Sequence, residues 1–218
     1  MTRVAIPLLL LLCLCLGMGT CKKKTTEGKG ALTIPMEEIE PALKAKELPR
    51  PNVDPKTVKT GDVIDFYNGV PVYFNGNTFH TAGRHLSEDG YNYGLRWQCV
   101  EFVKRYYYDY LNHEMPDTYG HAKDFFLPQL RDGQYNWLRD LQQFRNGGTL
   151  PPQVDDIIVF TGDEYGHVAI ISKVEAEQIE IVQQNVGIAS RHQLKLMNSK
   201  GRYYVMSKAV IGWLGRRD

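Results

Sequence analysis

Two side chains in this sequence have the types needed for a nucleophile and its base, Cys99 and His167. Cys99 lies at the start of a predicted helix over residues 97–111, WQCVEFVKRYYYDYL, whose apolar positions recur every three or four residues. Backbone N–H groups and the positive dipole end at a helix start lower the pKa of a thiol and favour its thiolate. The same N–H groups can bind the oxyanion that forms when a thiolate attacks a carbonyl. An arbitrary cysteine is more often a buried structural residue, so a base is needed to support this interpretation.

Histidine is the usual base for a thiolate nucleophile. Of the six histidines, His167 differs because it opens the apolar stretch HVAIISKV directly after the polar loop TGDEYG, residues 161–166. A polar residue at the mouth of a strand is placed to face a cleft. The sequence therefore predicts that His167 is the partner of Cys99.

A predicted hairpin supplies the third member of the site. If Val174 pairs with Gln178 across a three-residue loop, His167 lies opposite Asn185, with Gln183 as its diagonal neighbour. Side chains alternate between faces, so all three project to the same side. An amide oxygen can then accept a hydrogen bond from one imidazole nitrogen and leave the other for the thiol. A two-residue loop would shift the register and remove this arrangement.

The elements that must position these residues form an α+β pattern, one helix before a run of antiparallel strands. The helix over 97–111 is the clearest, and a second, short one is expected at 122–127 before Pro128. Residues 134–148 have no clear pattern. Strands are expected at 69–76, 156–160, 167–174, 178–185, 203–206 and 210–214.

The first 60 residues differ in composition from the rest. Residues 1–20 read as a secretory signal, because their apolar run of about 13 residues is shorter than the roughly 20 that a spanning helix needs. Cys21 follows small residues and resembles the lipid-modified cysteine of a bacterial lipoprotein; simple cleavage and a retained anchor are the alternatives. Residues 21–60, rich in proline and charge, are expected to be a tether, and residues 61–218 the folded domain.

Cysteine usage strengthens the case for chemistry at Cys99. The other three cysteines lie in the first 21 residues, which leaves one thiol in the body of the chain. In an exported protein a lone thiol is exposed to oxidation without a disulfide partner, so its retention favours a chemical role.

Charge and motifs exclude several classes of partner. The net charge is +1, with 26 basic and 25 acidic residues, which argues against a nucleic-acid binder. The sequence has no repeat, no metal-ligand spacing and no phosphate-cradling glycine loop, so we expect no cofactor and no metal.

Three segments, YGLRWQCVEFVKR, GHVAIISKVEAEQIEIVQQNV and VIGWL, resemble the cysteine/histidine-dependent amidohydrolase/peptidase (CHAP) family. Within it, the likeness is greatest to amidase domains of the glutathionylspermidine synthetase/amidase type, and it covers residues 61–215. The resemblance implies a papain-like fold, with the nucleophile at the start of a helix packed on an antiparallel sheet. It also implies that Cys99 is the nucleophile, His167 the base, and the QQN stretch their polar support.

One position departs from the family pattern. The family commonly has Glu where this chain has Gln183, within an EQN sequence. The amide oxygen of Gln183 can still orient His167, but it cannot stabilise the imidazolium by charge. Asn185 matches the family residue and is expected to share the role.

Four residues before the nucleophile, Tyr91, Tyr93, Trp97 and Gln98, are expected to line a substrate groove. The expected protein is a lipid-anchored hydrolase of the bacterial cell envelope, facing the periplasm or the exterior. It would cleave a peptide or amide bond in peptidoglycan through a thioester on Cys99. Two alternatives remain open: an amidase for a small glutathionylspermidine-like amide, and a weakened module that binds cell wall or a partner protein.

Overall fold

The computed structural model describes residues 48–116 and 120–217. The expected signal, Cys21 and most of the expected tether lie outside these residues. Within them, no helix is long and apolar enough to cross a membrane. Val53 and Val58, in the described part of the expected tether, pack against the core, so packed structure begins before residue 61.

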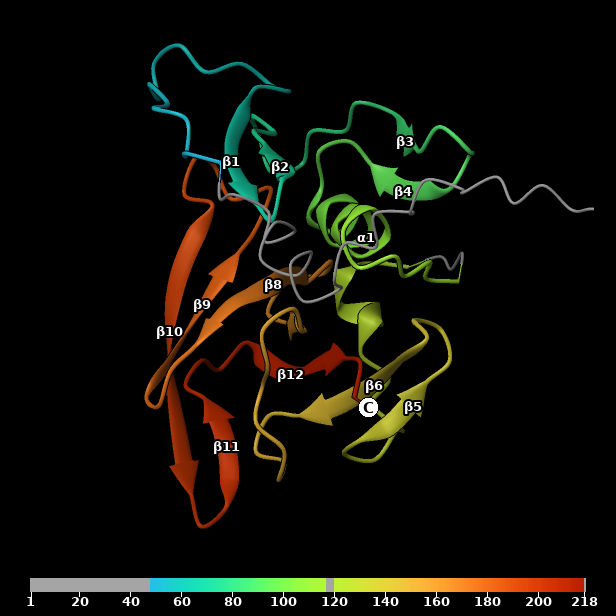
Figure 1. Ribbon diagram of the computed structural model, residues 1–218, viewed down its shortest axis with the longest axis vertical. Coiled ribbons are helices and arrows are strands. Elements are labelled where there is room, and N and C mark those ends of the chain that lie inside the picture. The colour runs from blue at the N-terminus through green and yellow to red at the C-terminus, as the bar shows by residue number, and fades with distance from the viewer. Residues whose placement is uncertain (1–47, 117–119, 218) are drawn as a thin grey trace, which may run out of the picture. The chain divides into compact units, whose positions relative to one another are not determined.

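An eight-stranded antiparallel sheet forms the body of the fold, in the order β11-β10-β9-β8-β7-β12-β6-β5 (Figure 1). The C-terminal strand β12 lies between β7 and β6. The strands are β5 (Gln134–Asn136), β6 (Leu141–Arg145), β7 (Ile157–Phe160), β8 (His167–Val174), β9 (Gln178–Val182), β10 (Arg191–Ser199), β11 (Arg202–Val205) and β12 (Val210–Gly215).

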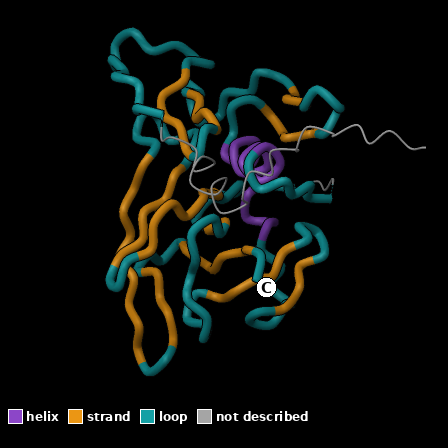
Figure 2. The backbone as a smooth tube through the Cα atoms, viewed as in Figure 1, coloured by secondary structure: helices purple, strands orange, loops and turns teal. Residues whose placement is uncertain are grey.

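Two small hairpins and one α-helix complete the architecture (Figure 2). The hairpins are β1 (Val63–Tyr67) with β2 (Val70–Tyr73), and β3 (Arg84–Leu86) with β4 (Asn92–Leu95). The helix α1 (Cys99–Asp109) packs against β8, β2 and β4, and a 3-10 helix, η2 (Ala122–Phe125), packs against β7 and β8. One helix packed against an antiparallel sheet confirms the predicted α+β class and is consistent with the papain-like fold.

The central strands are buried on both faces. Ile157 and Val159 face the core that contains α1, whereas Ile158 between them packs in a second core around Trp213. Strands covered on both sides need apolar side chains at successive positions, which explains the unbroken IIVF run of β7. Each fully buried aliphatic side chain contributes about 1.5–3 kcal/mol, so these strands form a rigid support for the site.

Several element boundaries differ from the sequence expectation. The α-helix begins at Cys99 and ends at Asp109, shorter at each end than predicted, and residues 134–148 contain β5 and β6. Strand β10 was not predicted, because six of its nine residues are exposed and its sequence has no apolar alternation. Its backbone pairs with β9 and β11, and such pairing leaves little trace in the side chains.

The predicted register of the β8–β9 hairpin is wrong at the turn. Val174 pairs with Ile179 rather than Gln178. A β-bulge between Ile171 and Lys173 then shifts the pairing by one residue. Beyond the bulge Ile170 pairs with Val182, as the predicted register requires. The shift at the turn and the shift at the bulge cancel, so the pairing near His167 follows the predicted register.

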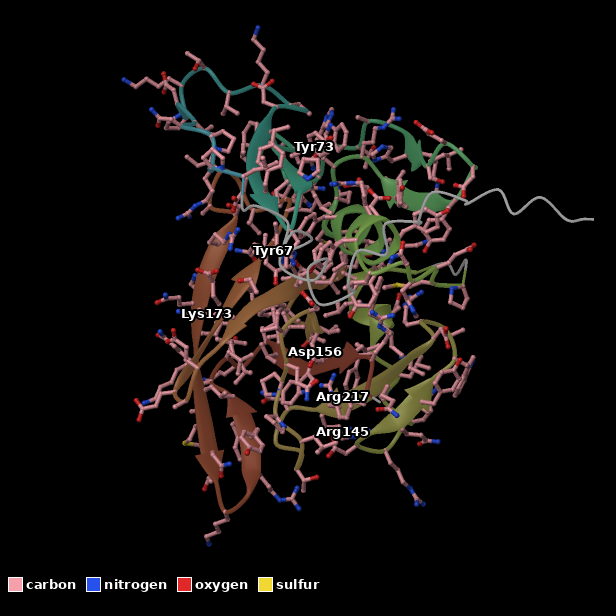
Figure 3. The ribbon with its side chains drawn as sticks, in the orientation of Figure 1. Tyr67, Tyr73, Arg145, Asp156, Lys173 and Arg217 are labelled. Carbon is pink, nitrogen blue, oxygen red and sulfur yellow. The ribbon has the colours of Figure 1, made fainter. Side chains whose placement is uncertain are left out.

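A buried ion pair holds the C-terminal end of the chain (Figure 3). Arg217 donates two hydrogen bonds of 2.7 Å to the carboxylate of Asp156, which is 1% exposed. The carboxylate lies against Gly215, where a Cβ would come within 1.8 Å of Asp156 Oδ1. A glycine is therefore required at that position for the pair to form.

Candidate active site

The thiol of Cys99 lies at the first residue of α1 and is 6% exposed. The preceding Gln98 has extended backbone and turns its side chain to the carbonyl oxygens of Thr78 and His80, at 3.2 and 2.7 Å, instead of capping the helix. The N–H groups at the helix start therefore remain available to the thiol, and the backbone N–H of Val100 hydrogen-bonds it.

His167 is the first residue of β8 and pairs with Phe160 on β7. The chain enters this strand through Gly166, whose φ of +69° favours glycine and where a Cβ would lie 2.6 Å from the carbonyl oxygen of Phe160. This glycine allows the tight approach that brings the imidazole to the start of α1.

Gln183 fixes the orientation of the imidazole. His167 Nε2–H donates a hydrogen bond to Gln183 Oε1 at 3.1 Å, and Gln183 Nε2 donates to the carbonyl oxygen of Ala189 at 3.4 Å. The second contact sets which way the amide faces, so its oxygen is the atom presented to the ring. Nδ1 then remains for the hydrogen bond between His167 and Cys99. The structure brings Cys99, His167 and Gln183 together.

Electrostatics at the pair favour a thiolate and an imidazolium. Burial opposes ionisation of Cys99, but the charge of His167, its hydrogen bond, and the backbone N–H groups of Val168 and Val100 outweigh burial and lower the pKa of the thiol. Burial likewise disfavours charge on His167, but the thiolate, its hydrogen bond, Gln183 and Asp163 raise the pKa of the imidazole. A thiolate poised in this way can attack a carbonyl carbon, and the imidazolium can protonate a leaving amine.

Asn185 does not share the hydrogen bond to His167 that the sequence predicted, because its side chain is bonded elsewhere. Its φ of +70° turns it away from the β9 direction. Asn185 Nδ2 donates to Gln98 Oε1 at 2.7 Å and to the carbonyl oxygen of Thr78 at 3.0 Å, and Asn185 Oδ1 accepts from Asn75 Nδ2 at 2.7 Å. Asn185 therefore holds the residue before the nucleophile and a neighbouring loop, leaving Gln183 as the amide partner of the imidazole.

Gln184, the middle residue of the QQN stretch, ties the end of the hairpin to α1, and this contact was not predicted. Its Nε2 donates to Glu101 Oε2 at 2.6 Å and to the carbonyl oxygen of Gln98 at 3.1 Å. Glu101, fully buried, also accepts from Arg105 Nε at 2.6 Å and contacts His85 Nδ1 at 2.7 Å. The i,i+4 spacing of Glu101 and Arg105 was a usable signal for an ion pair, although it gave no hint of Gln184.

The three aromatic residues expected to line a groove make ring contacts beside the helix. Tyr91 and Tyr93 are buried, and both contact Tyr108 near the end of α1. Tyr93 donates a hydrogen bond of 2.5 Å to Asp109. Trp97 packs on Tyr73, with ring centroids 3.9 Å apart. The rings of Tyr91 and Tyr93 therefore pack at the flank of the helix, whereas Trp97 and Gln98 are half-buried and their groove-lining role stays a prediction.

Two surface depressions, of about 360 and 300 Å³, are lined around Asp155 and Asp89 respectively, and neither lining includes Cys99 or His167. Among residues 48–116 and 120–217, no group of three or more His, Cys, Asp or Glu side chains could hold a metal ion.

Comparison with known proteins agrees with this geometry. A family model described as CHAP domain matches residues 89–185. The chain is 25% identical over 176 residues to trypanothione synthetase of Crithidia fasciculata. This alignment covers 73% of this chain and 27% of that protein. It is 30% identical over 138 residues to the bifunctional glutathionylspermidine synthetase/amidase of Escherichia coli K12, covering 56% of this chain and 22% of that protein.

The chain thus spans about a quarter of the length of these curated relatives. Among solved structures, "The crystal structure of Ly7917" matches at 17% identity over 54% of this chain and 53% of that chain, with a TM-score of 0.32, too low to support an argument. The family match includes the start of α1, the β8–β9 hairpin and the QQN stretch. Residues 89–185 are therefore a CHAP amidohydrolase domain, and the chain is a distant homologue of glutathionylspermidine synthetase/amidase and trypanothione synthetase.

Proposed function

We propose that this protein is a cysteine amidohydrolase in which Cys99 is the nucleophile, His167 the base and acid, and Gln183 the orienting group. The observation that carries the proposal is the chain of contacts from the thiol at the start of α1, through the imidazole, to the amide oxygen of Gln183. His167 lowers the pKa of the Cys99 thiol, and Cys99 raises the pKa of His167, so the pair favours the thiolate and the imidazolium that the reaction needs.

The reaction would proceed in two acyl transfers. The Cys99 thiolate attacks the amide carbonyl carbon, and His167 gives its proton to the leaving amine as the carbon–nitrogen bond breaks. A thioester on Cys99 remains. His167, now neutral, takes a proton from water, whose oxygen attacks the thioester and releases the carboxylic acid and the thiolate. Backbone N–H groups at the start of α1 supply hydrogen-bond donors near the attacked carbonyl.

For the substrate, we infer a peptide or amide bond in peptidoglycan. The support is the leader: a signal-like segment over residues 1–20 followed by Cys21 favours export and a lipid anchor at the cell envelope. Peptidoglycan is the amide-rich polymer that an enzyme anchored there meets. The inference rests on this expected location.

A second candidate is a small amide of the glutathionylspermidine type. It is favoured by the 30% identity to a protein whose name includes glutathionylspermidine amidase activity. A third candidate is a catalytically weakened binding module, which only the presence of Gln183 in place of the usual Glu favours.

Product analysis distinguishes the three candidate functions. Purified muropeptides and glutathionylspermidine are each incubated with the wild-type chain and with Cys99→Ala, and products are resolved by mass. Cleavage of muropeptides by the wild type alone supports the proposal, and cleavage of glutathionylspermidine alone replaces it with the second candidate. No cleavage of either favours the weakened binding module, and equal cleavage by Cys99→Ala rejects the cysteine mechanism.

A further inference from the structure

Two exposed aromatic side chains flank the candidate site. Phe79 is 77% exposed and Tyr165 is 44% exposed, and their rings meet edge to face with centroids 6.4 Å apart. Tyr165 also meets the ring of His121 at 4.9 Å. We call Phe79, Tyr165 and His121 the aromatic strip. Because the two exposed rings are adjacent, they form a contiguous apolar patch rather than isolated exposed residues, and such a patch indicates a contact surface.

The Phe79 end of the strip is held by the residues that position the nucleophile. Gln98, which precedes Cys99, donates to the carbonyl oxygens on both sides of Phe79, those of Thr78 and His80. Asn185 donates to the same Thr78 oxygen, and Asn75 donates to the carbonyl oxygen of His80 at 3.0 Å. The backbone that carries the exposed ring is thus fixed relative to the start of α1.

The Tyr165 end is held relative to the base. Tyr165 lies two residues before His167, in the loop between β7 and β8. Asp163 Oδ1 accepts from the backbone N–H groups of Tyr165 and Gly166, and the carbonyl oxygen of Tyr165 accepts from the N–H of Lys123 at 3.0 Å. The strip therefore joins the two loops that carry the nucleophile's support and the base.

We propose that Phe79 and Tyr165 form a platform on which a sugar ring of the substrate stacks, next to the bond that Cys99 attacks. A small apolar side chain is best bound in a concave pocket, whereas these rings stand out from the surface. A sugar ring has a face of C–H groups that suits an exposed aromatic ring, and hydroxyl groups at its rim that suit the Tyr165 hydroxyl and the His121 nitrogens. The inference rests on the proposed function, because peptidoglycan joins sugars to peptides through amides.

Binding is measured on the full chain carrying Cys99→Ala, with the tetramer of N-acetylglucosamine as probe, by titration calorimetry. We expect saturable binding, and Phe79→Ala and Tyr165→Ala in that background should each raise Kd at least about tenfold, since aromatic anchors dominate such contacts. Tyr135→Ala is the matched control, because Tyr135 on β5 is 52% exposed and is no part of the strip. Its Kd should equal that of the parent chain. Absence of binding, or equal Kd in all variants, overturns the platform.

Turnover kinetics on chains with Cys99 intact distinguish a failed platform from a failed function. If the wild type cleaves muropeptides and Phe79→Ala leaves KM unchanged, the function stands and the platform is wrong. If no muropeptide is cleaved but oligosaccharide binding still depends on Phe79, the platform stands and the proposed function is wrong. A rise in KM confined to substrates with bulky apolar residues assigns the strip to the peptide and overturns the sugar proposal.

Discussion

The imidazole of His167 lies between a thiol that gains from its positive charge and an amide that offers only a dipole. The thiolate and the hydrogen bond to Gln183 both raise the pKa of His167 against the effect of burial. A carboxylate at residue 183 would add a full negative charge beside the ring. The chain therefore has the geometry of a nucleophile, base and orienting group, with less stabilisation of the imidazolium than a carboxylate would give.

This residue-scale difference predicts the effect of substituting Gln183. Activity requires the thiolate and the imidazolium together, so it rises as Cys99 ionises and falls at high pH as His167 loses its proton. Gln183→Glu should raise the pKa of His167 and move the alkaline limb to higher pH. Gln183→Ala should lower kcat by about tenfold, less than the roughly 10²–10⁴-fold that acid–base catalysis contributes, because His167 itself is retained.

The measurement is a pH–rate profile for the wild type and both variants. The side chain of Asn185 is already hydrogen-bonded to Thr78, Gln98 and Asn75, so we expect no partial rescue by its amide. Three superimposable profiles would show that residue 183 has no influence on the imidazole.

At the scale of elements, the site depends on three consecutive side chains that contact three different parts of the fold. Gln183 contacts His167 on β8, Gln184 contacts Glu101 on α1, and Asn185 contacts Gln98 and the loop at Thr78. The end of the β8–β9 hairpin thereby sets the position of the helix start relative to the base.

The carboxylate of Glu101 is the charged group in this network, since it contacts Gln184, Arg105 and His85. Burial raises its pKa, but His85, Arg105 and Gln184 outweigh burial, and the pKa of Glu101 is lowered. A lowered pKa in the folded state stabilises the fold above the ordinary pKa of Glu, and this stability is lost as pH falls through the folded-state value.

Glu101→Gln should lower the free energy of unfolding by about 3–5 kcal/mol at pH 7, because it leaves Arg105 buried without its counter-charge. The difference from wild type should shrink as the pH is lowered. Urea unfolding at several pH values measures both effects. Glu175→Gln, which removes a surface ion pair with Lys173, is the control and should leave stability unchanged. A pH-independent difference would contradict the role assigned to the Glu101 charge.

Sequence reasoning reached the pair and its amide partner because local patterns indicate them: a cysteine at a helix start and a histidine at a strand mouth. It placed Gln183 correctly through a register that was wrong at the turn, since the bulge between Ile171 and Lys173 has no sequence signature. Asn185 was assigned to His167 because alternation was extended past Val182, where β9 ends, to Asn185, whose φ is positive. The QQN stretch was expected to support the site, but the contacts of Gln184 could not be predicted, since its partners are about 80 residues distant.

At the scale of the whole molecule, the folded domain carries the proposed chemistry, whereas the leader over residues 1–21 carries the proposed location. The α+β class was predictable because the central strands are buried on both faces and their apolar runs are unbroken. Strand β10 was not, because most of its side chains are exposed. The chemistry resides in residues 89–185, whereas the proposed site of action depends on residues 1–21, outside the described residues.

The leader makes a prediction that is independent of the active site. Cys21→Ser should release the chain from the membrane fraction and prevent incorporation of a palmitate analogue, because the thiol is the proposed site of acylation. Cys13→Ser is the matched control and should leave both unchanged. A Cys21→Ser protein that still sediments with membranes would replace the lipid anchor with a retained hydrophobic segment.

The central claim is that Cys99 is a thiolate held by His167, and its most direct test is the pH dependence of Cys99 alkylation. Iodoacetamide labelling is followed by mass spectrometry of the Cys99 peptide, which separates this thiol from Cys13, Cys15 and Cys21. In the wild type, labelling should titrate below the ordinary thiol range, and in His167→Ala the titration should move to higher pH. Labelling that titrates in the ordinary range, and identically in both proteins, would contradict the account.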